Sequence, residues 1–300
     1  MPYFAQLKLK DITRKLYQDA LNDLKDRGYS DSTREGIYRT GRMIFRKALE
    51  LELIKKDPTE FAYLKKGKKT IEQLEEEEIP KYLEKEELAL FLKTAKNQGL
   101  ALDYLMFLTL SYTGIRVGEL VALKWKDIDF VNQTISITKT YYNSNNNTVQ
   151  FQLVTPKTKK SRRKIVVDED VIKALSFHKE TPEKIIQQLG DAYYNQDFIF
   201  AKTERQPGYP TVIKMVQLRM ARLLAIAKLN PDLTPHSLRH THTSLLAEAG
   251  VALEQIMDRL GHLDDQITKN VYLHVTKEMK KEASQKFAQL MRSLHYYPLY

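Results

Sequence analysis

The chain has 300 residues, 42% of them hydrophobic and 29% charged, an ordinary globular composition for a chain longer than one hydrophobic core usually organises. Its 48 Lys and Arg residues outnumber 38 Asp and Glu residues, and the formal net charge of +10 favours a polyanionic partner such as nucleic acid. The absence of cysteine excludes disulfides, thiolate metal sites and cysteine nucleophiles. No stretch predicts a secretory signal or a membrane span, so we expect a cytoplasmic protein without a membrane partner.

The first 64 residues have the periodicity of helices. Apolar side chains recur at helix spacing between Ile12 and Leu24, and the letters STRE at residues 32–35 are typical of a capping box, which predicts a second helix to about Leu53. The arginines near one stripe of this second helix are Arg39, Arg42 and Arg46. The apolar residues toward another stripe are Ile37, Ile44 and Ala48. We expect the apolar stripe to pack and the arginines to contact phosphates, although a solvated charged face explains the pattern equally well.

A highly charged stretch separates this region from the rest of the chain. It contains KKGKKT and EQLEEEE and has little apolar periodicity, so we place a linker at about residues 66–80. The first domain is therefore predicted to cover residues 1–75, and the second to cover residues 81–300.

The second domain is predicted to be mostly helical with a small antiparallel sheet. A helical region begins at Glu84, and the nearly all-apolar residues 104–112 predict a buried helix that Gly114 ends. Alternation typical of strands follows at residues 134–138, 149–154 and 164–167. From Val171 the pattern is helical again, apart from a short apolar stretch at residues 198–200. The whole chain is thus expected to be mainly α with a small antiparallel β-sheet, an α+β fold.

Two polar segments connect these strands. The asparagine-rich residues 143–147 are expected to join the first two strands, and the basic residues 156–164 to form a hairpin tip before the third. The charged side chains of that tip include Lys159, Lys160, Arg162 and Arg163. They fit either a solvated turn or contacts with DNA.

The densest group of chemically useful residues is TPHSLRHTH at residues 234–242. Thr234 is a good N-cap and Pro235 a good first helical residue, so His236 is expected in the first turn, where free backbone N–H groups favour an anion. Arg239 is three residues further on, on the same helical face, and can present two N–H groups to phosphate oxygens. The segment therefore predicts a phosphate site.

His240 lies four residues after His236, which suggests a metal pair with His242 or His262 as a further ligand. A hydrolytic zinc site of this kind would carry a Glu inside the pair, whereas here Arg239 lies inside it and would repel a dication. We therefore predict no metal, and we expect His240 to be structural, packed or hydrogen-bonded behind the phosphate site.

Two further motifs surround this segment in sequence. In TGIRVGEL, Arg116 follows the glycine that ends the buried helix, and Glu119 is close enough to fix its guanidinium. Downstream, an amphipathic helix at residues 251–260 stops at Gly261, with His262 directly after the stop. A following helix, capped by one of two aspartates, is expected to carry Tyr272.

The order of these motifs resembles the tyrosine recombinase family, also called phage integrases: TGIRVGEL, KTKKSRRK, HSLRH, LGH and then a tyrosine ten residues later. The resemblance covers essentially all 300 residues. It implies a core-DNA-binding domain at the N-terminus and a catalytic domain that begins within residues 81–100. Many integrases carry a small arm-binding domain ahead of these two, and we expect none within this chain.

The resemblance also implies a role for each matching residue. Arg116 and Arg239 would clamp the phosphate, and His262 would hydrogen-bond it. Lys157 would be the general acid, although a slip in strand register would place Lys159 or Lys160 there instead. His236 would be the general base and Tyr272 the nucleophile. Glu119 and His240 would hydrogen-bond or pack against these residues without contacting the phosphate.

By resemblance, the chain would cut and rejoin double-stranded DNA at recombination core sites. The reaction would pass through a 3′-phosphotyrosyl intermediate, with no metal, ATP or other cofactor. The family acts as a synaptic tetramer, sometimes with accessory DNA-bending proteins. A tail helix at about residues 277–294 has apolar positions at Ala283, Phe287, Leu290 and Leu294. This helix could dock on a neighbouring protomer, or pack equally well on its own domain.

Three other functions remain alternatives. A type IB topoisomerase shares the nucleophile and the clamp but relaxes DNA without exchanging partners; the short chain and HSLRH favour a recombinase. A catalytically silent DNA-binding protein disagrees with the complete set of six candidate residues. A metal-dependent nuclease would depend on the histidine pair discussed above.

Overall fold

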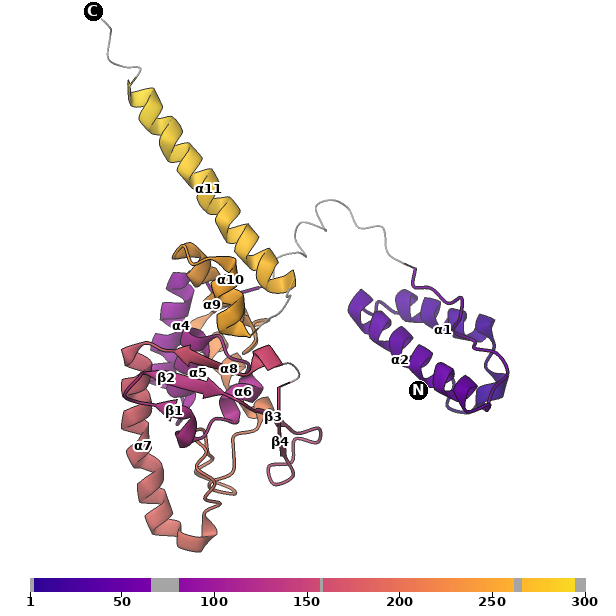
Figure 1. Ribbon diagram of the computed structural model, residues 1–300, viewed down its shortest axis with the longest axis horizontal. Helices are drawn as coiled ribbons and strands as arrows, with labels where there is room; N and C mark the ends of the chain where they lie inside the picture. The colour runs from indigo at the N-terminus through magenta and orange to yellow at the C-terminus, as the bar shows by residue number, and fades with distance from the viewer. Residues whose placement is uncertain (1–2, 66–80, 157–158, 262–265, 295–300) are drawn as a thin grey trace, which may run out of the picture. The chain divides into compact units, whose positions relative to one another are not determined.

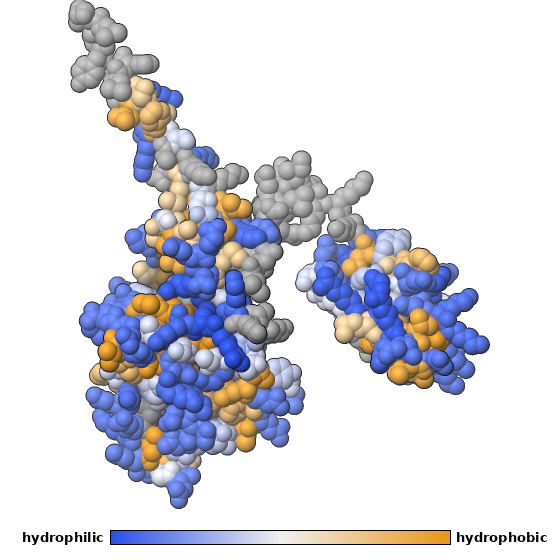
Figure 2. Space-filling model, viewed as in Figure 1, coloured by the Kyte–Doolittle hydropathy of each residue, from blue (hydrophilic) through white to orange (hydrophobic). Residues whose placement is uncertain are grey.

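The computed structural model describes residues 3–65, 81–156, 159–261 and 266–294. The chain forms two compact units, Met1–Leu74 and Glu75–Tyr300, which are described separately. Figure 2 shows mostly hydrophilic surfaces on both units, with hydrophobic residues at the surface of the first unit and along the last helix. No helix within the described ranges is long and apolar enough to cross a membrane.

The first unit is a small helical bundle. Its elements are η1 (Leu9–Asp11), α1 (Arg14–Asp26) and α2 (Asp31–Glu50). Ser30 caps α2 by accepting the Thr33 N–H, so the helix begins two residues before the predicted capping box and ends before Leu53. The core between the helices is formed by Ile12, Tyr17, Leu21, Leu24, Phe45, Ala48 and Ile54.

The packing face of α2 differs from the predicted stripe. Ile44, which was expected to pack, is 52% exposed, and the neighbouring Phe45 fills the core instead. Arg34 is buried on this helix, where it pairs with Asp31 and donates to the Lys65 carbonyl at 3.0 Å. Successive side chains on a helix point in directions about 100° apart, so Ile44 and Phe45 cannot both face the core. Burying the aromatic ring of Phe45 removes a large apolar area from water, which favours Phe45 at this position.

The second unit is built around one buried helix, α5 (Asp103–Thr113) (Figure 1). The helices that surround it are α4 (Lys85–Gln98), α6 (Val117–Val121), α7 (Glu169–Leu189), α8 (Ile213–Ala227), α9 (Ser237–Glu248), α10 (Leu253–Leu260) and α11 (Gln266–Leu294). Short 3-10 turns are η2 (Trp125–Asp127), η3 (Lys159–Ser161) and η4 (Gly190–Ala192). As predicted, Gly114 ends α5, in the left-handed conformation with φ +63°.

The strands form two small antiparallel sheets. One contains β1 (Ile128–Asp129), β2 (Thr134–Ile137) and β5 (Arg163–Val166) in the order β1-β2-β5. The other contains β3 (Thr140–Tyr142) and β4 (Gln152–Val154). The prediction of a mainly helical chain with a small antiparallel sheet is confirmed.

Two local predictions about this region were wrong. Residues 156–164 do not form a hairpin tip, because β4 pairs with β3 and β5 pairs with β2, so the basic segment connects one sheet to the other. The loop at residues 143–147 leads to the second predicted strand, β4, but it follows β3, a strand that was not predicted. The tail predicted at about residues 277–294 is helical, but it forms the second part of α11, which runs unbroken from Gln266, since no glycine or proline follows Tyr272 within the helix.

Candidate active site

Arg116 lies at the N-cap of α6, directly after the turn that ends α5. Glu119, one turn into α6, accepts the Arg116 backbone N–H at 2.9 Å and its guanidinium at 3.1 Å. The Arg116 side chain stays 38% exposed, whereas that of Glu119 is only 2% exposed. Thus a buried carboxylate orients a cation that solvent, or a ligand, can still reach.

Glu119 also binds a second arginine, from β5. Arg163 donates to its two carboxylate oxygens at 3.2 and 2.9 Å. Burial works to raise the pKa of Glu119, but the hydrogen bonds and positive charge of Arg163, together with the Arg116 backbone N–H, outweigh it and lower the pKa below its ordinary value. Glu119 is therefore ionised at neutral pH and ties β5 to α6.

The HSLRH motif covers the start of α9. The backbone turn from Thr234 closes through Ser237, whose N–H donates to the Thr234 carbonyl at 2.8 Å, so α9 begins at Ser237 and His236 occupies the N-cap position. This start is later than predicted. His236 is exposed, and its ring meets that of the buried His240 edge-on, with centroids 4.8 Å apart.

Arg239 joins α9 to two other chain segments. Its side chain is buried, and its guanidinium donates to the Gly114 carbonyl at 2.5 Å and to the Leu260 carbonyl at 2.7 Å. Gly114 ends α5 two residues before Arg116, and Leu260 ends α10 two residues before His262. One side chain thus brings three of the predicted motifs together.

The corner after α10 lies against the basic segment. Gly261 has φ +71°, and a Cβ added there would come within 3.1 Å of both the Lys160 carbonyl and Arg163 Cδ. The corner that leads to His262 therefore contacts the segment that follows Lys157. Lys157 and His262 themselves lie outside the described residues.

Tyr272 lies in α11, three residues before the buried Val275. It is half-buried and packs against a cluster made of Ala247, Ile256, Leu260 and Val275. The cluster joins α11 to α9 and α10, the helices that carry Arg239 and lead to His262. The structure thus places Tyr272 on an element packed beside the arginine site.

The residues expected to contact DNA fall into three groups. Arg39 and Arg46 are exposed on α2, with Arg39 paired to Glu35, and Arg42 is half-buried and donates to the Tyr38 hydroxyl. Among the basic-segment residues, Lys160 and Arg162 are exposed, and Lys159 lies in η3. Arg163 does not fit the prediction, because its side chain is only 6% exposed and its donors bind Glu119.

His242 and Arg259 are site-region residues that sequence reasoning missed as partners. Arg259 Nε donates to His242 Nε2 at 3.0 Å, and His242 Nδ1 lies 2.8 Å from the Ser111 carbonyl. Both ring nitrogens of His242 thus bind Ser111 and Arg259, not a group shared with His236 and His240. Across the described part of the chain, no three His, Asp or Glu side chains gather as metal ligands. The sequence offered no signal for this pair, since Arg259 resembles any arginine in the last turn of an amphipathic helix.

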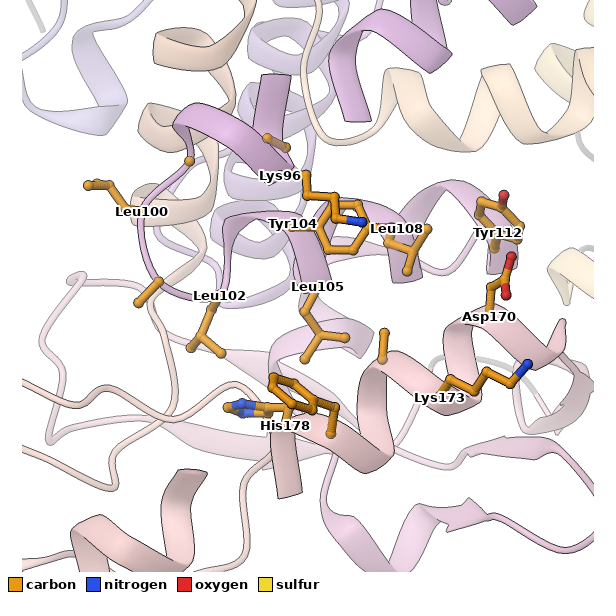
Figure 3. Close-up of a pocket in the computed structure, with 15 residues that line it drawn as sticks. Lys96, Leu100, Leu102, Tyr104, Leu105, Leu108, Tyr112, Asp170, Lys173 and His178 are labelled. Atoms are coloured by element: carbon orange, nitrogen blue, oxygen red, sulfur yellow. The ribbon is translucent and has the colours of Figure 1, made fainter. Parts of the chain in front are cut away.

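A separate cavity of about 770 Å³ lies between α5 and α7 (Figure 3). Its lining includes Tyr104, Asp170 and His178 but none of the predicted site residues. His178 Nε2 donates to the Ile199 carbonyl at 3.0 Å, and burial lowers the pKa of this histidine. The cavity is therefore separate from the arginine site, and its histidine is bound to the backbone.

Known proteins similar to this chain include integrases. The model of the phage integrase family matches residues 81–279. The chain is 35% identical over 239 residues to the integrase of Staphylococcus phage L54a, covering 76% of this chain and 66% of that protein. It is 28% identical over 295 residues to the ICEBs1 integrase of Bacillus subtilis strain 168, covering 96% of this chain and 74% of that protein.

Solved structures show the same fold. The Tn1549 transposon integrase, in complex with transposon right end DNA, matches with a TM-score of 0.69 at 23% identity, covering 93% of this chain and 87% of that one. Relatives named tyrosine recombinases, together with the family match, place the chain in the tyrosine recombinase class of enzymes. Within that class, the chain belongs to the phage integrase family. It spans about two thirds of the length of the phage L54a relative.

Proposed function

We propose that this chain is a site-specific recombinase that cuts and rejoins double-stranded DNA through a covalent bond between Tyr272 and a 3′ phosphate. The observation that carries the proposal is the position of Arg239, which binds the end of α5 and the end of α10 at once. These segments lead to Arg116 and His262. An arginine site assembled in this way supplies permanent positive charge for a phosphate.

Each residue has a defined task in the proposed reaction. Arg116 and Arg239 bind the non-bridging phosphate oxygens, and His262 donates a hydrogen bond to the same group. A tyrosine hydroxyl has an ordinary pKa of about 10, so it needs His236 to take its proton as it attacks phosphorus. The bond to the 5′ oxygen breaks, and Lys157 protonates that oxygen.

The phosphotyrosyl bond conserves the energy of the broken phosphodiester. A 5′ hydroxyl from another strand can then attack phosphorus, release Tyr272 and seal the DNA without ATP. Two guanidinium groups stabilise the charge that develops in the transition state, so the proposed mechanism uses no metal.

The proposed partner is double-stranded DNA at recombination core sites. The net charge of +10 supports it, as do the solved DNA complexes of the Tn1549 and lambda integrases. We assign core-DNA binding to residues 1–75, followed by a linker at about 66–80 and the catalytic domain at 81–300. Exposed Arg39 and Arg46 of α2 and Lys160 and Arg162 of the basic segment are the proposed phosphate contacts.

We further propose that the chain assembles as a tetramer through α11. Every described side chain between Lys281 and Arg292 is exposed, including Phe287 at 63% and Leu290 at 60%. A hydrophobic strip of this kind on an exposed helix is typical of a contact with another chain. Ala283 and Leu294, the other two predicted apolar positions, have side chains outside those the structure describes.

Adduct formation tests the proposed chemistry. The chain is incubated in EDTA with a nicked duplex that carries its recombination site, and covalent protein–DNA product is measured by denaturing electrophoresis. We expect an adduct that Tyr272→Phe abolishes. An adduct with Tyr272→Phe would refute the nucleophile, and cleavage that requires added divalent metal would refute the mechanism. Strand exchange between two sites, rather than plasmid relaxation alone, distinguishes a recombinase from a topoisomerase.

A further inference from the structure

Arg259 connects four segments of the second unit. Its Nε donates to His242 on α9, Nη1 donates to the Val166 carbonyl of β5 at 2.9 Å, and Nη2 donates to the Tyr112 carbonyl of α5 at 3.1 Å. The residue itself lies in the last turn of α10. Its own carbonyl accepts Arg163 Nε at 2.8 Å.

His242 extends this connection to a second carbonyl of α5. The Ser111 carbonyl can only accept, so Nδ1 of His242 carries the proton and donates to it at 2.8 Å. Nε2 is then unprotonated, which is what the Arg259 donor requires. Burial and the nearby positive charge of Arg259 lower the pKa of His242 to about 3, so the ring stays neutral at physiological pH.

The segments joined by this pair are the ones that hold Arg239. Arg259 and His242 bind the carbonyls of Tyr112 and Ser111, just before Gly114, and Arg259 is the residue before Leu260. Gly114 and Leu260 supply the two carbonyls that accept from the Arg239 guanidinium. The distance between those acceptors therefore depends on how α10 is fixed to the end of α5.

The approach between these segments is close. A Cβ on Gly114 would lie 2.7 Å from both His242 Cδ2 and Leu260 Cδ2. A side chain that shifted at this contact would press on the residues that supply the acceptors of Arg239, because Gly114 lies close to both His242 and Leu260.

We propose that Arg259 and His242 form one positioning unit, which sets the separation of the Gly114 and Leu260 carbonyls and thereby aims the Arg239 guanidinium at the scissile phosphate. The inference rests on the proposed function for its catalytic consequence. The proposed reaction assigns no catalytic group to either residue, so the unit acts through Arg239.

The first test does not depend on activity. Hydrogen–deuterium exchange is measured on the full chain and on Arg259→Lys. This change keeps the positive charge, but one ammonium group replaces a guanidinium that donates to three acceptors. In Arg259→Lys we expect faster exchange than in the unsubstituted chain for peptides from the C-terminal ends of α5 and α10. Exchange in α4 should be the same in both proteins. Unchanged exchange at both ends would overturn the positioning unit, whether or not the chain cleaves DNA.

The second test measures the catalytic consequence. Arg259→Lys and His242→Phe should each lower the single-turnover rate of adduct formation by about 10- to 100-fold, with DNA affinity unchanged within about 2-fold, since small displacements of a charged group are costly. The double variant should be no slower than the slower single variant, as expected of residues that act together. Arg222→Lys is the matched control, because Arg222 also donates to a backbone carbonyl, that of Gln98, away from the site.

A modified substrate distinguishes a loss of Arg239 positioning from a general loss of protein structure. A methylphosphonate at the scissile position removes the negative charge that Arg239 would stabilise, so the defect of Arg259→Lys should shrink with it. A defect of equal size on both substrates would show that Arg259 does not act through the clamp. If the unsubstituted chain forms no adduct at all, the proposed function fails, and the exchange experiment still decides whether the pair fixes the two segments.

Discussion

Arg239 joins the three segments that carry or lead to Arg116, His262 and itself. Its guanidinium binds two backbone carbonyls from distant segments, a geometry that needs a planar fork with separate donors. Lysine would preserve the charge but reach only one acceptor well. We therefore expect Arg239→Lys to lower the rate of adduct formation by about 10²- to 10³-fold, the effect of removing one preorganised donor from a transition state.

Single-turnover kinetics on the nicked duplex measure this effect. Arg219→Lys is a useful comparison, because Arg219 also combines a carbonyl with a buried partner, Asp103, outside the site. A rate for Arg239→Lys equal to that of the unsubstituted chain would remove Arg239 from the clamp.

Glu119 should contribute to stability as well as to alignment. Replacing it with Gln would leave the Arg163 guanidinium buried without its ionised partner, which costs about 3 kcal/mol of unfolding free energy. Because the folded pKa of Glu119 is depressed, its contribution is present above the unfolded value of 4.5 and is lost as pH falls through the folded pKa. Urea unfolding of both proteins should therefore show a stability difference at pH 7 that narrows in strong acid. A difference independent of pH would contradict the ionised state.

His242 makes a second pH-dependent contribution, in a higher window. Its folded pKa is about 3 and its ordinary value is 6.5, so the unfolded chain binds a proton between these values that the folded chain does not. Stability should fall as pH is lowered from about 6.5 toward 3. His178, also with a lowered pKa, acts in the same direction. Unfolding of His242→Gln at pH 7 and pH 5 should show a smaller pH dependence than the unsubstituted chain, and an equal dependence would refute the buried neutral histidine.

At the scale of elements, glycine corners position the ends of α5 and α10. Gly261 has φ +71°, and an added Cβ would meet the Lys160 carbonyl and Arg163. Gly250 has a similar φ of +78°, with nothing within 4 Å of an added Cβ. Alanine at either position should cost about 1 kcal/mol of stability through the backbone alone.

Only Gly261→Ala should also slow adduct formation, because it displaces the corner that leads to His262. The measurement pairs thermal unfolding with the single-turnover rate for both variants. Equal rates for Gly261→Ala and Gly250→Ala would show that the corner has no influence on the chemistry.

The elements differ in how well their sequence specifies them. The buried helix before Gly114 and the helix before Gly261 were predicted correctly, because a long apolar or amphipathic run ends in a residue that tolerates the left-handed conformation. Strand pairing was predicted wrongly, since β3 and β4 have only three residues each and alternation does not reveal which partner a strand chooses. The exposure of Arg163 and the burial of Ile44 were predicted wrongly for a related reason. Contacts with other elements decide which of several neighbouring residues is buried.

For the whole molecule, the fold class and the family could be recognised from the order of short motifs. The network behind them could not, because His242 and Arg259 lie 17 residues apart and join only through the packing of α9 on α10. Arg239 shows the same limit. Its proposed phosphate role was inferred from HSLRH, whereas its two carbonyl acceptors, 125 and 21 residues away, required the structure.

Assembly should depend on the exposed side of α11. We expect Phe287→Glu combined with Leu290→Glu to leave adduct formation on a single half-site intact but to abolish the four-protomer complex, since charge on both residues removes the hydrophobic contact. Native electrophoresis with full-site DNA measures the complex. Gln289→Glu, on the same exposed helix, is the matched control. A normal complex in the double variant would exclude this part of α11 from the interface.

The position of Tyr272 on the last helix has a consequence for synthesis. Translation produces the first helical unit, then Arg116 and Arg239, before it reaches α11. Under the proposed mechanism, a chain terminated before Tyr272 would carry the proposed DNA-binding unit and both arginines but would lack the nucleophile. Under that mechanism, only a chain elongated beyond Tyr272 could cut a strand, because Tyr272 follows every other proposed site residue in the sequence.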